Sequence, residues 1–72
     1  MATRPSKPWR LVTPSTDGPI YKPQRSEAAT RSAVGEEKQA TTADQIIVEK
    51  WEGGRWEEWL RWIRNGDGWQ AQ

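Results

Sequence analysis

The pattern of apolar and polar positions predicts a pair of strands near the start of the chain. Residues 9–13 and 20–22 are short stretches of strand-forming residues. The loop between them contains the Asp17-Gly18 turn signal, and glycine accepts positive φ without steric cost. The pattern therefore favours a first β-hairpin.

An amphipathic helix is expected over residues 27–39. Its apolar stripe is narrow and made mainly of alanine, and charged residues occupy its other faces. Ser26 is a good N-cap, and Glu27 places a negative charge in the first turn, where the helix dipole favours it. Gly35 weakens such a helix by about 1 kcal/mol relative to alanine and favours an early end. A polar linker over residues 40–44 follows.

A second hairpin is expected around Gly53-Gly54, a recognised two-residue loop. Residues 45–51, which precede it, are rich in β-branched side chains and are typical of a strand. The register that follows from the loop pairs Glu52 with Arg55, Trp51 with Trp56, Lys50 with Glu57, Glu49 with Glu58, and Val48 with Trp59. It contains two opposite-charge pairs, an aromatic pair and an apolar pair, each worth about 0.2–1 kcal/mol.

Residues 55–65 also fit a helix. Trp56, Trp59, Leu60 and Ile63 have the spacing of one helical face, and Asn65-Gly66 would suit its C-terminus. The cross-strand pairs favour the hairpin, but the choice between strand and helix stays open at this point.

These elements predict an α+β fold with the order strand-strand-helix-strand-strand. It would be a small antiparallel sheet with one helix packed on it. The 72 residues allow one domain, which we place at residues 9–65. Residues 1–8 are expected to be a disordered lead-in and residues 66–72 a flexible tail.

The apolar inventory for a core is small. Leu, Ile and Val together supply nine residues, Phe is absent, and the mean hydropathy is -1.04. Six tryptophans compensate, because each aromatic ring can bury about 150–250 Å². The core candidates are Trp9, Leu11, Ile20, Ala29, Ala33, Ile46, Val48, Trp56 and Trp59.

The absence of Cys and His limits the chemistry that the chain can carry. Disulfides, thiolate nucleophiles and ordinary zinc sites are excluded. The acidic pairs Glu36-Glu37 and Glu57-Glu58 are neighbours in sequence and point to different faces, so neither makes a natural carboxylate dyad. We expect no catalytic residues, no metal site, no cofactor and no enzymatic activity. With no long apolar run and no apolar leader, we also expect a cytoplasmic protein without a membrane partner.

Charge is unevenly distributed, although the whole chain carries only +1. Residues 1–25 have a net charge of +4 and residues 26–72 a net charge of -3. The basic end supports a nucleic-acid-binding hypothesis, against which stands a pI of only 8.1. Its candidate residues are Arg4, Lys7, Arg10, Lys22 and Arg25.

Tryptophan and arginine are enriched at the energetic centres of protein interfaces. Trp51, Arg55, Arg61 and Trp62 are therefore candidates for a protein-binding patch. Alternatively, Trp51 and Trp62 pack on a sheet face or in a helix–sheet contact. We favour a small non-catalytic module that binds another protein. The alternatives are a nucleic-acid-binding module and a structural protein that forms a homodimer through a sheet edge.

The run at residues 9–13, the alanine-rich helix and the closing segment at residues 47–56 give the chain a family likeness. It resembles small uncharacterised α+β proteins of actinobacteria and their phages. The resemblance suggests a phage-type accessory protein that engages a host protein. The element order is also similar, in topology alone, to the hybrid-binding domain of some ribonucleases H. Neither resemblance implies a function by itself.

Overall fold

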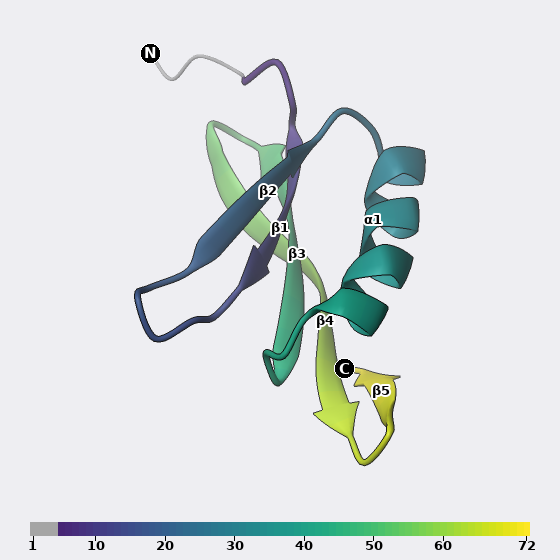
Figure 1. The fold of residues 1–72 in the computed structure, drawn as a ribbon. Helices are drawn as coiled ribbons and strands as arrows, with labels where there is room; N and C mark the ends of the chain where they lie inside the picture. Colours follow the sequence, from purple (N-terminus) through teal and green to yellow (C-terminus); the bar gives the residue numbers. More distant parts are fainter. Residues whose placement is uncertain (1–4) are drawn as a thin grey trace.

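The computed structural model describes residues 5–72, which form five strands and one helix (Figure 1). In chain order these are β1 (Trp9–Thr13), β2 (Ile20–Gln24), α1 (Glu27–Ala40), β3 (Gln45–Glu52), β4 (Arg55–Asn65) and β5 (Gly68–Ala71). All strand pairs are antiparallel, and the sheet order is β2-β1-β3-β4-β5. The predicted α+β class, with the helix on one side of the sheet, is confirmed.

Helix α1 begins at the predicted cap. The Ser26 hydroxyl oxygen accepts a hydrogen bond from the Ala29 backbone N–H at 3.1 Å, which satisfies one of the free donors of the first turn. The helix continues through Gly35 and ends at Ala40. The helix expected over residues 27–39 is therefore confirmed to within one residue, and Gly35 does not end it early, because packing of the helix on the sheet outweighs the low helix propensity of one glycine.

The β3–β4 hairpin confirms the strand interpretation of residues 55–65. Gly53 and Gly54 have φ values of 63° and 81°, and a type I′ turn requires positive φ at both central positions. Four of the expected cross-strand pairs are present. They are Glu52 with Arg55, Trp51 with Trp56, Lys50 with Glu57, and Glu49 with Glu58.

The fifth expected pair is wrong because the register shifts between Val48 and Glu49. Val48 stands opposite Leu60, and Trp59 is an extra residue in β4, a β-bulge. Side chains on a regular strand alternate between the two faces, and the bulge interrupts this alternation. Trp56 therefore lies on one face of the sheet, while Leu60 lies on the other.

The end of the chain is also more ordered than expected. Gly68–Ala71 pairs with the second half of β4 as strand β5, after a turn in which Gly66 has a φ of 62°. The Trp69 indole N–H donates to the carbonyl of Lys38 in the last turn of α1, at 3.1 Å. The flexible tail predicted for residues 66–72 is therefore corrected to a strand that is tied to the helix.

The expected disordered lead-in can be judged only in part, because residues 1–4 lie outside the described residues. Pro8 is buried, and its carbonyl accepts a hydrogen bond from the Trp51 N–H at 2.7 Å. The chain is thus attached to the sheet from Pro8 onward.

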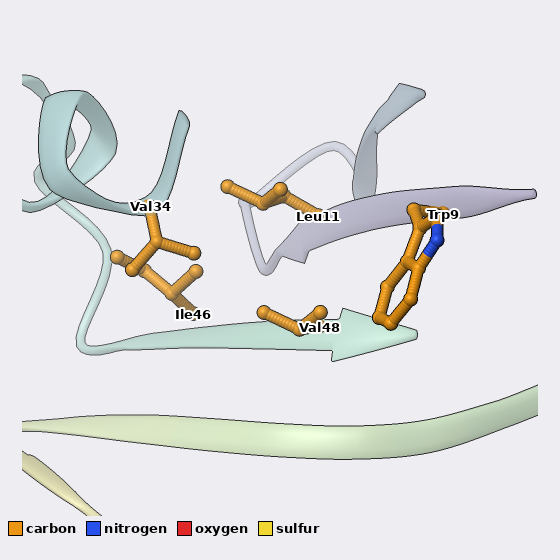
Figure 2. Close-up of a cluster of buried hydrophobic side chains, with 5 residues drawn as sticks. All are labelled: Trp9, Leu11, Val34, Ile46 and Val48. Carbon is orange, nitrogen blue, oxygen red and sulfur yellow. The ribbon is translucent and has the colours of Figure 1, made fainter. Parts of the chain in front are cut away.

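The core lies between α1 and the central strands. Figure 2 shows Trp9 and Leu11 on β1 and Ile46 and Val48 on β3, with Val34 of α1 directed toward them. Leu11, Ile46 and Val48 have no exposed surface. Around this cluster pack partly buried apolar side chains, namely Ala33, Leu60, Trp62 and Trp69.

Three core predictions need correction. Ile20 is 47% exposed because β2 is an edge strand and α1 makes few contacts with it. Trp56 is half-buried on the sheet face away from the helix. Trp59 is 39% exposed, although its ring touches that of Trp9. Ala29, like Ala33, is partly buried.

Candidate functional site

The sheet has one face covered by α1 and one without such a cover. Among residues 5–72 no helix or strand packs on the second face, which we call the uncovered face. The register and the alternation of side chains assign residues of four strands to it. They include Arg10, Val12, Tyr21, Ile47, Glu49, Trp51, Trp56, Glu58, Arg61 and Ile63.

Arg10 organises the centre of the uncovered face. Its guanidinium carbon lies 4.3 Å from the ring centroid of Tyr21 and 4.1 Å from that of Trp56. Its Nε donates to the carboxylate of Glu49 at 2.6 Å, and both side chains are about three-quarters buried. The Arg10 side chain of β1 thus connects Tyr21 of β2 with Trp56 of β4. Cation–π contacts of this kind contribute about 0.5–2 kcal/mol each.

Trp51 extends this arrangement. Its ring meets that of Trp56 edge to face, with centroids 5.5 Å apart and an interplanar angle of 75°. Such pairs contribute about 0.5–1.5 kcal/mol beyond the area they bury. We call Arg10, Tyr21, Glu49, Trp51 and Trp56 the Arg10 cluster. Its side chains contact one another in a row from β2 to β4.

The charges on the uncovered face are paired. Arg61 contacts Glu58 at 2.6 Å and also donates to the Gln45 side-chain oxygen. The hydrogen bond to Glu58, followed by the charge of that carboxylate, raises the pKa of Arg61 above its ordinary value. Since Arg10 is paired with Glu49, the two arginines and two glutamates of this face cancel. The uncovered face is therefore aromatic and nearly neutral.

A groove lies at the β2 side of the Arg10 cluster and has a volume of about 260 Å³. Its walls combine aromatic rings, prolines and two cationic side chains. The lining residues are Pro5, Ser6, Lys7, Arg10, Tyr21, Pro23 and Trp56. Tyr21 is 49% exposed, so its ring is available at the surface.

The structure does not gather the four predicted protein-binding residues into one patch. Trp51 and Arg61 lie on the uncovered face. Trp62 stands opposite the core residue Ile46 and packs on the helix side. Arg55 lies at the hairpin tip, where its Nε contacts Glu57 at 2.5 Å. The four residues therefore do not form one patch, and of them only Trp51 belongs to the Arg10 cluster.

The sequence prediction missed Tyr21 and Trp56 as surface residues. The register of the two hairpins contained the information, since Trp56 opposite Trp51 must share its face. It did not show which face α1 would cover.

The predicted nucleic-acid-binding residues are also dispersed. Arg4 lies outside the described residues. Arg10 is paired with Glu49, and Lys22 contacts the buried carboxylate of Glu37 at 2.6 Å on the helix side. Lys7 and Arg25 are exposed. Among the described cations, Lys7 and Arg10 line the same groove, whereas Lys22 lies on the helix side, so they do not form one basic surface.

The side chains of the Glu57-Glu58 pair point apart, as their adjacent positions in the sequence indicated. Glu57 contacts Arg55, and Glu58 contacts Arg61. In the described part of the chain, no group of three or more His, Cys, Asp or Glu residues is arranged to hold a metal ion.

The helix of the described region is too short and too polar to cross a membrane.

Comparison with known protein families, curated proteins and solved structures finds no match to this chain. The resemblance to small proteins of actinobacteria and their phages stays a prediction.

Proposed function

We propose that this protein is a non-catalytic binding module that engages another protein through its uncovered face. The observation that carries the proposal is the Arg10 cluster. The Arg10 guanidinium contacts the rings of Tyr21 and Trp56 and is paired with Glu49. These contacts hold the two rings in a fixed arrangement. Tyr, Trp and Arg are the residue types that dominate the energetic centres of protein interfaces.

The paired charges favour a protein partner over a nucleic acid. Nucleic-acid affinity comes largely from cations that neutralise phosphates. On the uncovered face, Arg10 and Arg61 already have carboxylate partners, and a phosphate would have to compete with Glu49 and Glu58. A partner with apolar side chains at its centre meets no such competition, and the groove beside Tyr21 offers space for them. On the sequence resemblance, we propose that this partner is a protein of the host of a phage.

The test compares capture of a partner by the protein and by surface variants. Tagged protein is incubated with an actinobacterial lysate, with and without nuclease, and retained proteins are identified by mass spectrometry. We expect one defined protein that survives nuclease treatment and is lost with Tyr21→Ala and with Trp56→Ala. Tyr21→Ala removes an exposed ring and is expected to leave the fold intact, which circular dichroism checks.

Ile20→Ala is the matched control. Ile20 is as exposed as Tyr21, but it stands opposite Thr13 and belongs to the other side of the sheet. It should retain the partner. Capture that disappears with nuclease would overturn the proposal in favour of nucleic acid, and capture unchanged by both ring truncations would move the interface elsewhere.

A further inference from the structure

A second surface feature lies on the opposite side of the sheet, in the cleft between α1 and β4. The cleft has a volume of about 160 Å³. Val34, Val48 and Leu60 provide apolar surface, and Trp59 and Trp62 of β4 stand against α1. Small-molecule sites usually measure about 300–1,000 Å³, so this cleft suits one side chain of a larger partner.

Gly35 keeps the cleft open. It lies on the α1 wall between the positions of Arg31 and Lys38, and a Cβ built on it would meet no atom within 4 Å. A glycine is therefore not required at this position to let the backbone of α1 approach the sheet. A residue with low helix propensity stands at this point of the helix, although a larger one would fit.

Two polar groups of the cleft, on Lys38 and Trp62, have no acceptor among residues 5–72. The Lys38 ammonium lies 3.2 Å from the centroid of the Trp62 ring and has no carboxylate within ion-pair distance among residues 5–72. The Trp62 indole nitrogen is buried and has no hydrogen-bond partner in the described chain. Arg31, in contrast, contacts Glu27 at 3.1 Å. The cleft thus has a cation available for a carboxylate from outside.

The strand that forms one wall of the cleft also has an unpaired edge. Strand β5 pairs with residues Trp62–Asn65 of β4, along the edge of β4 that faces away from β3. The last backbone hydrogen bond between the two segments runs from the Gln72 N–H to the carbonyl of Arg61, at 2.9 Å. Within the described chain no strand lies beside residues 55–60 of β4 on this side. Trp59 and Leu60 belong both to this free edge and to the cleft. An exposed edge accepts an added strand through its backbone groups.

We propose that an extended acidic peptide of a partner protein adds to β4 along residues 55–60. One large apolar side chain of the peptide enters the cleft, and a carboxylate two residues away pairs with Lys38. Residues i and i+2 of a strand point to the same face, so both groups reach the helix side together. The acidic groups of β4 do not oppose this, because Glu57 and Glu58 are paired with Arg55 and Arg61. The site is separate from the uncovered face and does not depend on the function proposed for it.

The test uses a library of random nine-residue peptides, displayed with both ends blocked, and selects binders on the intact protein. We expect enrichment of sequences with a large apolar residue and a Glu or Asp two positions from it. The best peptide and its Glu→Gln counterpart are then compared by fluorescence anisotropy. The acidic form should bind at least fivefold more tightly.

Three protein variants locate the site. Lys38→Met keeps the aliphatic contact with Trp62 and should abolish the preference for the acidic peptide. Gly35→Leu fills the cleft and should weaken binding at least tenfold, whereas Gly35→Ala occupies little of it and should change affinity less than twofold. Tyr21→Ala, on the uncovered face of β2 at the other end of the sheet, should bind the peptide normally.

Strand addition makes a further demand on the backbone. Methylation of the peptide nitrogens that face β4 should abolish binding, while methylation of the alternate nitrogens should be tolerated. The proposal is overturned if no peptide is enriched, if the selected peptides lack the acidic residue, or if Gly35→Leu binds as well as Gly35→Ala.

Discussion

The rings of Trp9 and Trp59 meet edge to face, with centroids 4.9 Å apart and an interplanar angle of 83°. They come from β1 and β4, which are not neighbours, because β3 lies between them. The contact therefore passes over the central strand on the helix side. Trp59 is the extra residue of the β4 bulge, and this contact accounts for the position of its side chain.

The Trp9–Trp59 contact should be measurable as a coupling energy. In a double-mutant cycle with Trp9→Ala and Trp59→Ala, we expect about 0.5–1.5 kcal/mol of interaction in the free energy of unfolding. Urea denaturation followed by circular dichroism provides the measurement. Trp59→Ala combined with Ile20→Ala is the control, and these two changes should add within about 0.5 kcal/mol. Strict additivity of the two tryptophan changes would contradict the contact.

Leu11 and Ile20 test which apolar residues form the core. Leu11 is fully buried and Ile20 is 47% exposed, although both fitted the core by sequence. We expect Leu11→Ala to lower the free energy of unfolding by about 2–5 kcal/mol, through lost burial and a cavity. Ile20→Ala should change it by about 0.5 kcal/mol or less. Equal losses in urea denaturation would place Ile20 in the core after all.

The turn at Gly53-Gly54 should tolerate one substitution and resist another. Both residues have positive φ, and a Cβ on Gly53 would meet no atom within 4 Å. The free-energy cost of a side chain at Gly53 would therefore come from the backbone conformation and not from a clash. Gly54→Ala should destabilise the protein by about 1–2 kcal/mol, because an L-residue is strained at this φ. Gly53→Asn should be close to neutral, since Asn-Gly is a preferred type I′ sequence. Thermal unfolding of the two variants should differ in this order.

The cap of α1 gives a prediction with an internal control. Ser26→Ala removes the acceptor of the Ala29 N–H and should cost about 0.5–2 kcal/mol. Ser32→Ala, at an exposed position within the helix, should be neutral or slightly stabilising because alanine is the better helix former. If the melting temperatures of both variants fall equally, the loss does not come from the cap.

The fold was predictable where local chemistry decides it. The Gly53-Gly54 turn fixed the first four pairs of the β3–β4 hairpin, and Ser26 fixed the start of α1. The missed strand β5 also had a local signal, since Gly66-Asp67 between Asn65 and Gly68 is a two-residue hairpin loop. The polar and glycine-rich composition of residues 66–72 instead favours a flexible tail, and Asn65-Gly66 equally fits the C-terminus of the alternative helix.

The bulge explains why residues 55–65 resembled a helix. Trp56 and Ile63 lie on the uncovered face, whereas Trp59 and Leu60 lie on the helix side. Because the bulge interrupts the alternation of the strand, the apolar residues fall at positions 56, 59, 60 and 63, which is also the spacing of one face of a helix. The sequence near the bulge does not distinguish the two, because the Trp59 ring packs against Trp9, which is distant along the chain.

The candidate site was predictable only as a residue type. Tryptophan and arginine indicated an interface, but their assignment to faces depends on which side α1 covers. The side that α1 covers is decided by tertiary packing. It places Trp62 against the core and leaves Trp56 on the uncovered face. The sequence predicts that Arg10 contacts phosphates, yet it stands opposite Glu49 on the neighbouring strand and pairs with that carboxylate.

The bulge also has a consequence for how the chain length can vary. If Trp59 is left out, the pairs on either side of it, Glu49 with Glu58 and Val48 with Leu60, follow one another as in a regular ladder. In terms of insertions and deletions, Trp59 behaves as a one-residue insertion that β4 absorbed without displacing either half of the hairpin. Loss of this single codon would keep every other side chain of β4 on its present face. The strand therefore contains one position at which a relative of this protein can differ in length while both of its surfaces are preserved.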